Sequence, residues 1–155
     1  MKIAKLHSLL LMAAVAMMVA SCSDDGCLEN RSAVPRAAFY QGSSAVSVSR
    51  LSVVGIGVPG DSNLVTGATA SQVELPLRAT SGSTSFSLSI DSVGTDTLTL
   101  SYTAVPTFVS KECGATYFYD IKGVTVTHNF IDSVTVLTPT ITNTAQTNLK
   151  IYLQQ

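Results

Sequence analysis

Apolar and polar residues alternate along most of the chain after residue 35. The alternation is cleanest over residues 86–90 and 97–102, and it is typical of strands that bury one face. Gly, Pro, Asp and Ser separate these segments at short spacing, and no 3.6-residue apolar period is sustained. We therefore predict an all-β fold, a single β-sandwich of immunoglobulin-like or related type, with a small β-barrel as the alternative.

The pattern predicts nine or ten short strands. The break in alternation between Val48 and Leu51 indicates a β-bulge, and residues 55–62 read as a turn. Pro76 cannot donate a ladder hydrogen bond, so its strand should lie at a sheet edge. The expected strands are 36–40, 46–57, 72–78, 86–90, 97–102, 107–110, 116–121, 124–127, 131–137 and 148–153.

The N-terminal segment has a different pattern. Lys2 and Lys5 precede an apolar run over residues 9–20, which is shorter than the roughly 20 residues of a spanning helix and is typical of a secretory signal. Val-Ala-Ser-Cys at 19–22, which overlaps the end of this run, resembles the bacterial lipobox, which implies cleavage before Cys22 and acylation of its thiol. The alternative is an ordinary signal peptide in which this cysteine occurs by chance. We expect a signal peptide over 1–21, a lipidated Cys22 and tether over 22–35, and an all-β domain over 36–155.

Lipidation of Cys22 would anchor the mature protein to a membrane without a spanning helix. Ser23, Asp24 and Asp25 follow directly and resemble the acidic export signal of Bacteroidota lipoproteins. This resemblance implies an outer-membrane location, on the periplasmic or cell-surface face, while the alternative is a plain polar tether.

Charge excludes one class of partner. Charged residues make up 12% of the chain, against roughly 25% in typical globular domains. Loss of Lys2 and Lys5 would leave seven basic and ten acidic residues, a net charge of −3. With no basic patch, we expect no nucleic-acid binding.

The chain has three cysteines, and lipid would occupy Cys22. Cys27 and Cys113 then form an even remainder, which in an oxidising compartment predicts one disulfide. The alternative is two buried thiols. No further cysteine or histidine lies at metal-ligand spacing near either one, so we expect no metal site.

Four short features resemble a family of uncharacterised Bacteroidota lipoproteins, a domain of unknown function. They are the early Cys27 after the lipobox, the Val-Glu-Leu-Pro-Leu strand at 73–77, the corner at 109–114 that ends in Cys113 and Gly114, and the closing segments 141–143 and 149–152. That family usually has an acid after the Asn and a His before the last strand, where this chain has Thr144 and Asn148. The resemblance implies a lipoprotein class and no mechanism.

Two motifs suggest chemistry that we do not expect. Residues 55–60 match the glycine pattern of dinucleotide-binding loops, but no helical period follows to receive a pyrophosphate, so a hairpin turn and no cofactor are expected. His128, Asp132 and Ser133 could form a hydrolase site if all three met in one pocket. A surface histidine at a strand end is the favoured interpretation, and we expect no enzyme activity.

Acids near strand ends are expected to cap turns or protect edges, as at Asp91, Asp96, Asp120 and Asp132. A glycosidase would instead need two of them roughly 5–9 Å apart across a cleft. Three Asp-Ser/Thr-aliphatic triplets resemble the O-glycosylation motif of exported Bacteroidota proteins, with chance as the alternative. Their hydroxyls, on Ser92, Thr97 and Ser133, would have to be exposed.

Alternation places Phe118 on one face and Tyr117 and Tyr119 on the other, which is ordinary sheet construction. The favoured function is a non-catalytic accessory or binding module of the outer membrane, anchored through Cys22 and partnered by an outer-membrane protein. A glycan- or ligand-binding module is the alternative, and it would need a concave patch with Tyr117 or Tyr119 exposed.

Overall fold

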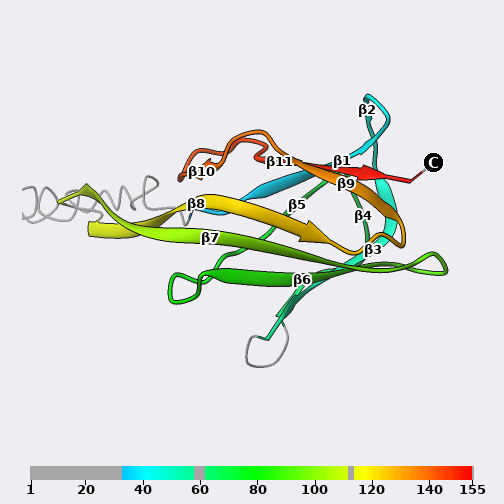
Figure 1. Cartoon of the computed structure of the whole chain (residues 1–155), viewed down its shortest axis with the longest axis horizontal. Helices are drawn as coiled ribbons and strands as arrows, with labels where there is room; N and C mark the ends of the chain where they lie inside the picture. Colours follow the sequence, from blue (N-terminus) through cyan, green and yellow to red (C-terminus); the bar gives the residue numbers. More distant parts are fainter. Residues whose placement is uncertain (1–32, 58–61, 112–113, 155) are drawn as a thin grey trace, which may run out of the picture.

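A computed structural model describes residues 33–57, 62–111 and 114–154, and these form strands and connecting turns without any helix (Figure 1). Accordingly, this part of the chain contains no helix of the length and apolarity needed to cross a membrane. The strands are β1 (Arg36–Gln41), β2 (Ser44–Ala45), β3 (Val48–Ile56), β4 (Ser62–Ala70), β5 (Gln72–Glu74), β6 (Ser83–Ile90), β7 (Gly94–Ser110), β8 (Gly114–Val126), β9 (Ile131–Val136), β10 (Thr140–Ile141) and β11 (Leu149–Leu153).

The strands form two sheets. The first has the order β2-β1-β11-β9, with β5 also paired to β1, and its β1–β11 pair is parallel. The second has the order β10-β8-β7-β6-β3-β4 and is antiparallel throughout. The chain passes between the sheets several times, so neither sheet could form its hydrophobic face without the other.

The hydrophobic core lies between the two sheets. Alternate residues of β1 and β11 face alternate residues of β3, β6 and β7, and their side chains are almost fully buried. The predicted all-β, two-sheet fold is confirmed. The largest fully buried side chains are Phe39, Leu51, Val53, Leu75, Phe86, Leu88, Leu98, Leu100, Ile131, Ile141, Leu149 and Ile151.

The local features expected in β3 and β5 are present. The pairing of β3 with β4 shifts register between Val48 and Leu51, and Arg50 in this bulge has a φ of 55°. β5 lies at an edge, as Pro76 predicted, but it ends at Glu74 rather than Arg78. Directly after β5, the Leu75 amide donates to the Pro35 carbonyl at 3.0 Å, so the contact with the start of the described chain continues one residue further.

Several expected strand boundaries are wrong. β4 was not predicted, because residues 62–70 are mostly exposed and carry few apolar residues. Segments 97–102 and 107–110 are one 17-residue strand, β7, and segments 116–121 and 124–127 are one 13-residue strand, β8. A bulge interrupts the pairing of β7 and β8 where Ser101 opposes Gly123 and Tyr102 opposes Ile121, and it coincides with the predicted boundary in β8. The predicted boundary in β7, over residues 103–106, lies instead in a regular part of the ladder.

The β7–β8 hairpin projects beyond the rest of the molecule (Figure 1). β6 pairs with β7 only as far as Ser101, and β10 pairs with β8 at Tyr119 and Asp120. Within the described part of the chain, the ladder over residues 105–110 and 114–118 is therefore formed by β7 and β8 alone. β1 starts at the same end of the molecule toward which this hairpin projects (Figure 1).

Candidate functional site

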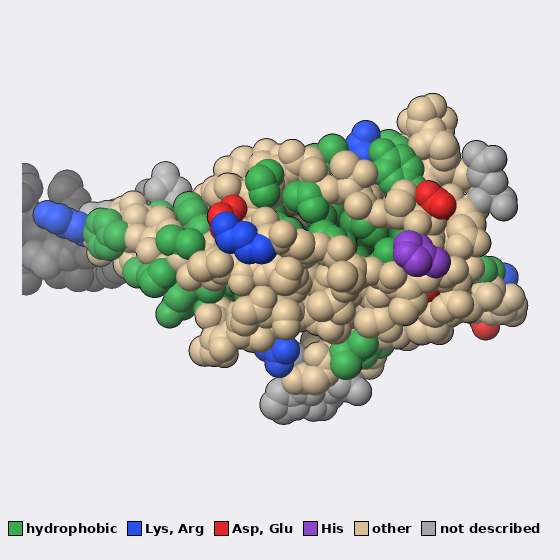
Figure 2. Space-filling view, in the orientation of Figure 1, with side chains coloured by type: hydrophobic (Ala, Val, Ile, Leu, Met, Phe, Trp, Pro, Cys, Tyr) green, Lys and Arg blue, Asp and Glu red, His purple; other side chains and the backbone are tan. Residues whose placement is uncertain are grey.

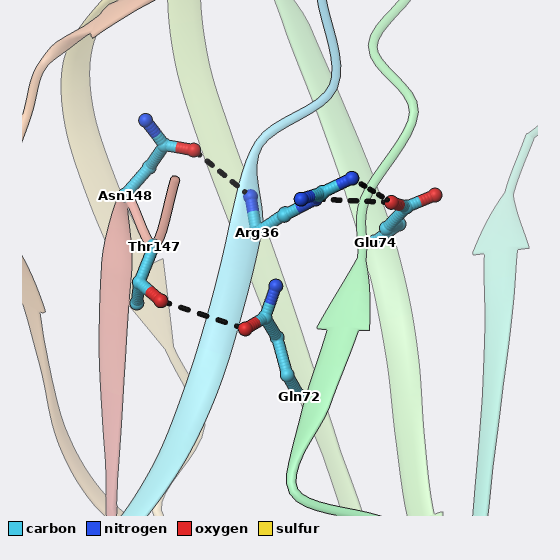
Figure 3. Close-up of polar contacts among 5 residues, drawn as sticks. All are labelled: Arg36, Gln72, Glu74, Thr147 and Asn148. Atoms are coloured by element: carbon cyan, nitrogen blue, oxygen red, sulfur yellow. Dashed lines mark hydrogen bonds and ion pairs between the residues drawn. The ribbon is translucent and has the colours of Figure 1, made fainter. Parts of the chain in front are cut away.

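A small cleft lies where β1 and β5 begin to pair. The Arg36 guanidinium donates to Glu74 Oε1 through Nε at 3.0 Å and Nη2 at 2.9 Å (Figure 3). The cleft beside this ion pair has a volume of about 300 Å³. It is lined by Val34, Arg36, Glu74, Thr142, Asn143, Thr144 and Ala145.

Asn148 fixes one wall of this Arg36–Glu74 cleft. Its side chain is buried, and its Oδ1 accepts a hydrogen bond from the Arg36 backbone N–H at 3.1 Å, while its own N–H donates to the Arg36 carbonyl at 2.9 Å. Beside it, Thr147 Oγ1 donates to Gln72 Oε1 at 3.5 Å (Figure 3). These contacts hold the start of β1 against β11, so the Arg36 side chain extends from a well-fixed backbone.

The chemistry of the Arg36–Glu74 cleft suits binding better than catalysis. Its cation and its anion are bonded to each other, and the other polar groups lining it are hydroxyls and an amide. An ion pair of this kind can orient a small polar ligand. Among the described residues, no group of three or more His, Cys, Asp or Glu could hold a metal ion.

The hydrolase hypothesis needed His128, Asp132 and Ser133 in one pocket. Ser133 Oγ donates to Asp132 Oδ2 at 2.9 Å, but these neighbours lie on the exposed edge strand β9. His128 Nδ1 instead lies 3.2 Å from the Ile131 carbonyl oxygen. A depression near this end is lined by Asp132 but by neither His128 nor Ser133. The three residues therefore do not come together in this depression.

The glycine motif at 55–60 begins at the end of a strand. Gly55 and Ile56 are the last residues of β3, Gly57 has a φ of 73°, and β4 starts at Ser62 and pairs antiparallel with β3. The motif thus connects two strands of a hairpin, as expected, although residues 58–61 lie outside the described residues.

Asp96 is the buried acid that the sequence did not distinguish from the others. Its carboxylate is fully buried. It accepts four hydrogen bonds of 2.6–2.9 Å from the turn between β8 and β9. The donors are the Thr127 hydroxyl and the backbone N–H groups of Asn129, Phe130 and Ile131.

Burial by itself raises the pKa of Asp96, but these hydrogen bonds lower it by more, so the pKa of this carboxyl lies below its ordinary value of 3.8. Asp96 is therefore an ionised structural acceptor that ties β7 to the β8–β9 turn. The expectation that such acids cap turns is confirmed for this residue.

The three glycosylation candidates differ in exposure. Ser92 is exposed in the β6–β7 turn, where its φ is 64°, and Ser133 is exposed on β9. Thr97 is half-buried within β7, and the aspartate of its triplet is the buried Asp96. The requirement of an exposed hydroxyl is thus met by Ser92 and Ser133 but poorly by Thr97.

The expected alternation at 117–119 is confirmed. Tyr119 is buried and its hydroxyl donates to the Leu77 carbonyl at 3.2 Å, whereas Tyr117 is 45% exposed on the projecting hairpin. Burial, together with the neighbouring Tyr102 and Tyr117, raises the pKa of Tyr119. Tyr117 does not line the Arg36–Glu74 cleft, so this cleft is not the tyrosine-bearing concave patch that the glycan-binding alternative needs.

Cys22, Cys27 and Cys113 lie outside the described residues, as does the acidic segment at 24–25. The described chain begins at Ala33, which is already buried in the core. Lipidation, the disulfide and the signal peptide therefore stay predictions.

The described residues form a two-sheet, all-β domain. Its Arg36 and Glu74 pair with each other, and its Asp96 is hydrogen-bonded to the β8–β9 turn. Comparison with known proteins then identifies the family. The chain belongs to the DUF6452 family, a family of unknown function, whose model matches residues 50–153. This range includes three of the four features behind the resemblance noted in the sequence, all except Cys27. No curated protein and no solved structure gives a significant match.

Proposed function

We propose that this chain is an envelope lipoprotein, anchored to the outer membrane through lipid on Cys22, and that its β-sandwich is a non-catalytic accessory or binding module. The observation that carries the proposal is the lipobox-like Val-Ala-Ser-Cys at 19–22, which overlaps the end of a 12-residue apolar run at 9–20. The resemblance to Bacteroidota lipoproteins and the acids at 24–25 support the outer-membrane location.

The geometry of the domain is compatible with a role that needs no chemistry. The buried carboxylate of Asp96 is occupied by four structural hydrogen bonds. Arg36 and Glu74 form an ion pair, and His128 Nδ1 lies beside the Ile131 carbonyl oxygen rather than beside Ser133. Groups held this way contribute to a rigid binding surface rather than to proton or group transfer.

Metabolic labelling with a palmitate analogue tests the anchor. We expect the wild-type protein to incorporate the label and to fractionate with membranes, and Cys22→Ser to lose both properties. Cys27→Ser is the matched control, because it removes a cysteine five residues away that the lipobox does not include. Retention of the label by Cys22→Ser would refute lipidation at this position.

A Cys27–Cys113 disulfide is a second part of the proposal. The Leu75 N–H donates to the Pro35 carbonyl and the Leu77 carbonyl accepts a hydrogen bond from the Tyr119 hydroxyl, so residues 75–77 link the start of the described chain to β8. Cys27 is six residues from Ala33 and Cys113 is six from Tyr119, and extended chains of that length each span about 20 Å. Equal spans would allow the two cysteines to meet near the end of the hairpin.

Non-reducing peptide mapping by mass spectrometry tests this link. We expect one crosslinked peptide containing both cysteines in protein isolated from the envelope, and free thiols at both would refute it. In the chain-entropy model a loop of this length contributes about 4 kcal/mol, so Cys27→Ser should also lower the melting temperature.

Crosslinking of the natively anchored protein, followed by affinity capture and mass spectrometry, tests the accessory role. A stoichiometric outer-membrane protein that is absent from a Cys22→Ser control would support it. An eluate with no such protein would contradict it and favour the second candidate.

The second candidate is a glycan- or small-ligand-binding module, and the Arg36–Glu74 cleft is the observation that favours it. The cleft of about 300 Å³ is bordered by residues 142–145, next to the closing segment that carries the family resemblance. A glycan array tests it with wild type and Glu74→Gln, which keeps the size of the side chain and removes its charge. Binding that Glu74→Gln weakens would support this function, and absence of wild-type binding would count against it.

A further inference from the structure

The face of β7 and β8 that forms core inside the sandwich continues onto the projecting hairpin. Inside, Tyr102 and Tyr119 are 4% and 7% exposed, and their rings meet edge to face at 5.4 Å between centroids. Because side chains of a strand alternate, the same face next carries Pro106 opposite Tyr117, and then Phe108 opposite Ala115. Phe108 is 67% exposed and Tyr117 is 45% exposed, so the apolar face continues beyond the region where the first sheet buries it.

The opposite face of the hairpin is also partly apolar. Val105 is 45% exposed there and pairs with Phe118. The hydrophobic side chains on this projecting end are visible in Figure 2. Large exposed apolar groups gathered at one end of a domain are typical of a contact with a partner or a membrane.

The position of the hairpin relative to Cys22 favours the membrane. β1, which follows the first described residues, starts at the end of the molecule toward which the hairpin projects (Figure 1). Ala33 is 11 positions after Cys22, and an extended chain of that length spans at most about 40 Å, whereas the free part of the hairpin extends about 20 Å beyond its base. A bilayer that holds lipid on Cys22 can therefore lie against the end of the hairpin.

We propose that the free end of the β7–β8 hairpin, through Phe108 and Tyr117 on one face, lies in the phospholipid interface as a second membrane contact. This inference rests on the proposed lipid anchor. The Phe108 ring would lie at the boundary between headgroups and acyl chains, while tyrosine suits the headgroup level because its ring is apolar and its hydroxyl is polar. The contact would orient the domain with the β6–β7 turn away from the bilayer. Because β7 has 17 residues, this turn lies about 50 Å from the free end of the hairpin.

The absence of tryptophan from the chain permits a direct test. Phe108→Trp places the sole tryptophan on the hairpin, and Val93→Trp places it in the β6–β7 turn, where Val93 is 63% exposed. Each full-length lipoprotein is reconstituted into phosphatidylcholine vesicles with or without lipids brominated on the acyl chains. We expect blue-shifted emission and strong quenching for Phe108→Trp, and unshifted, unquenched emission for Val93→Trp.

A second pair of variants controls for the affinity of tryptophan itself for membranes. Tyr117→Trp is the reporter, with or without Phe108→Ser, and we expect Phe108→Ser to reduce the quenching. If vesicle-bound protein shows no quenching at position 108, or equal quenching at 93 and 108, the membrane contact is refuted while the anchor stands. If wild-type protein fails to sediment with vesicles, the anchor itself is refuted, and the contact with it.

Discussion

The two ends of β7 obey the same alternation but have different surroundings. Near its start, Leu98 and Leu100 are completely buried between the sheets. Near its end, Phe108 occupies the same face of the strand and is 67% exposed. The difference arises because the first sheet, through β1 and β11, covers the middle of β7 and does not extend over the hairpin.

This contrast shows that periodicity decides which face of a strand is apolar, and that neighbouring elements decide whether the face is buried. Inside the sandwich an apolar face contributes to stability. On the free hairpin it contributes little to stability and is available for binding. Substitutions along β7 and at its contacts can therefore separate folding from function.

The largest effect is expected for Leu100→Ala, compared with Phe108→Ala on the same strand. Leu100 is fully buried, so truncation should lower the free energy of unfolding by about 2–5 kcal/mol. Phe108→Ala should change it by no more than about 0.5 kcal/mol. Urea unfolding measures both values. A loss at Phe108 as large as that at Leu100 would mean that another part of the protein covers the hairpin in solution.

Asp96→Ala should have the next largest effect. It leaves three backbone N–H groups and one hydroxyl without their acceptor in a buried site, which should cost about 2–4 kcal/mol. The control is Asp120→Ala, where the carboxylate is partly exposed and paired with Lys122, and the expected loss is below about 1 kcal/mol. Similar losses for the two variants would contradict the structural role of Asp96.

The pH dependence of the free energy of unfolding should reflect the lowered pKa of Asp96. The pKa of Asp96 is lower in the folded protein than in the unfolded chain, so its contribution is present above its ordinary pKa of 3.8 and is lost as pH falls through the folded-state value. Wild type should therefore lose more stability than Asp96→Asn on acidification from neutral pH. Denaturant unfolding of both proteins over this range measures the difference, and parallel curves would contradict the lowered pKa.

The smallest effect is expected at the Arg50–Asp91 pair, on the surface beside the β6–β7 turn. The two side chains are 63% and 69% exposed and their charged atoms lie 3.4 Å apart. Arg50→Ala should change the free energy of unfolding by less than about 0.5 kcal/mol, and less still at high salt. Thermal unfolding at two salt concentrations measures this, and a larger loss would mean that the pair also supports the β3 bulge.

Much of the fold could be predicted because the local signals were strong. The alternation over 86–90, the bulge after Val48 and the edge position implied by Pro76 each follow from a rule that acts within one strand. β4 escaped prediction because an exposed strand needs few apolar residues, and its ladder with β3 supplies the order. The sequence divides β8 at a bulge and β7 at residues 103–106, and the continuity of each strand follows only from its pairing with the other.

Sequence alone therefore determined the fold class, the apolar face of each regular strand and the signal-like segment that ends at Cys22, because these depend on neighbouring residues. It could not select Asp96 from the other acids, since the donors to its carboxylate lie 31–35 residues further along the chain. Nor could it show the Arg36–Glu74 cleft or the uncovered hairpin. Only the tertiary structure decided those, because burial and pairing depend on which distant segments pack together.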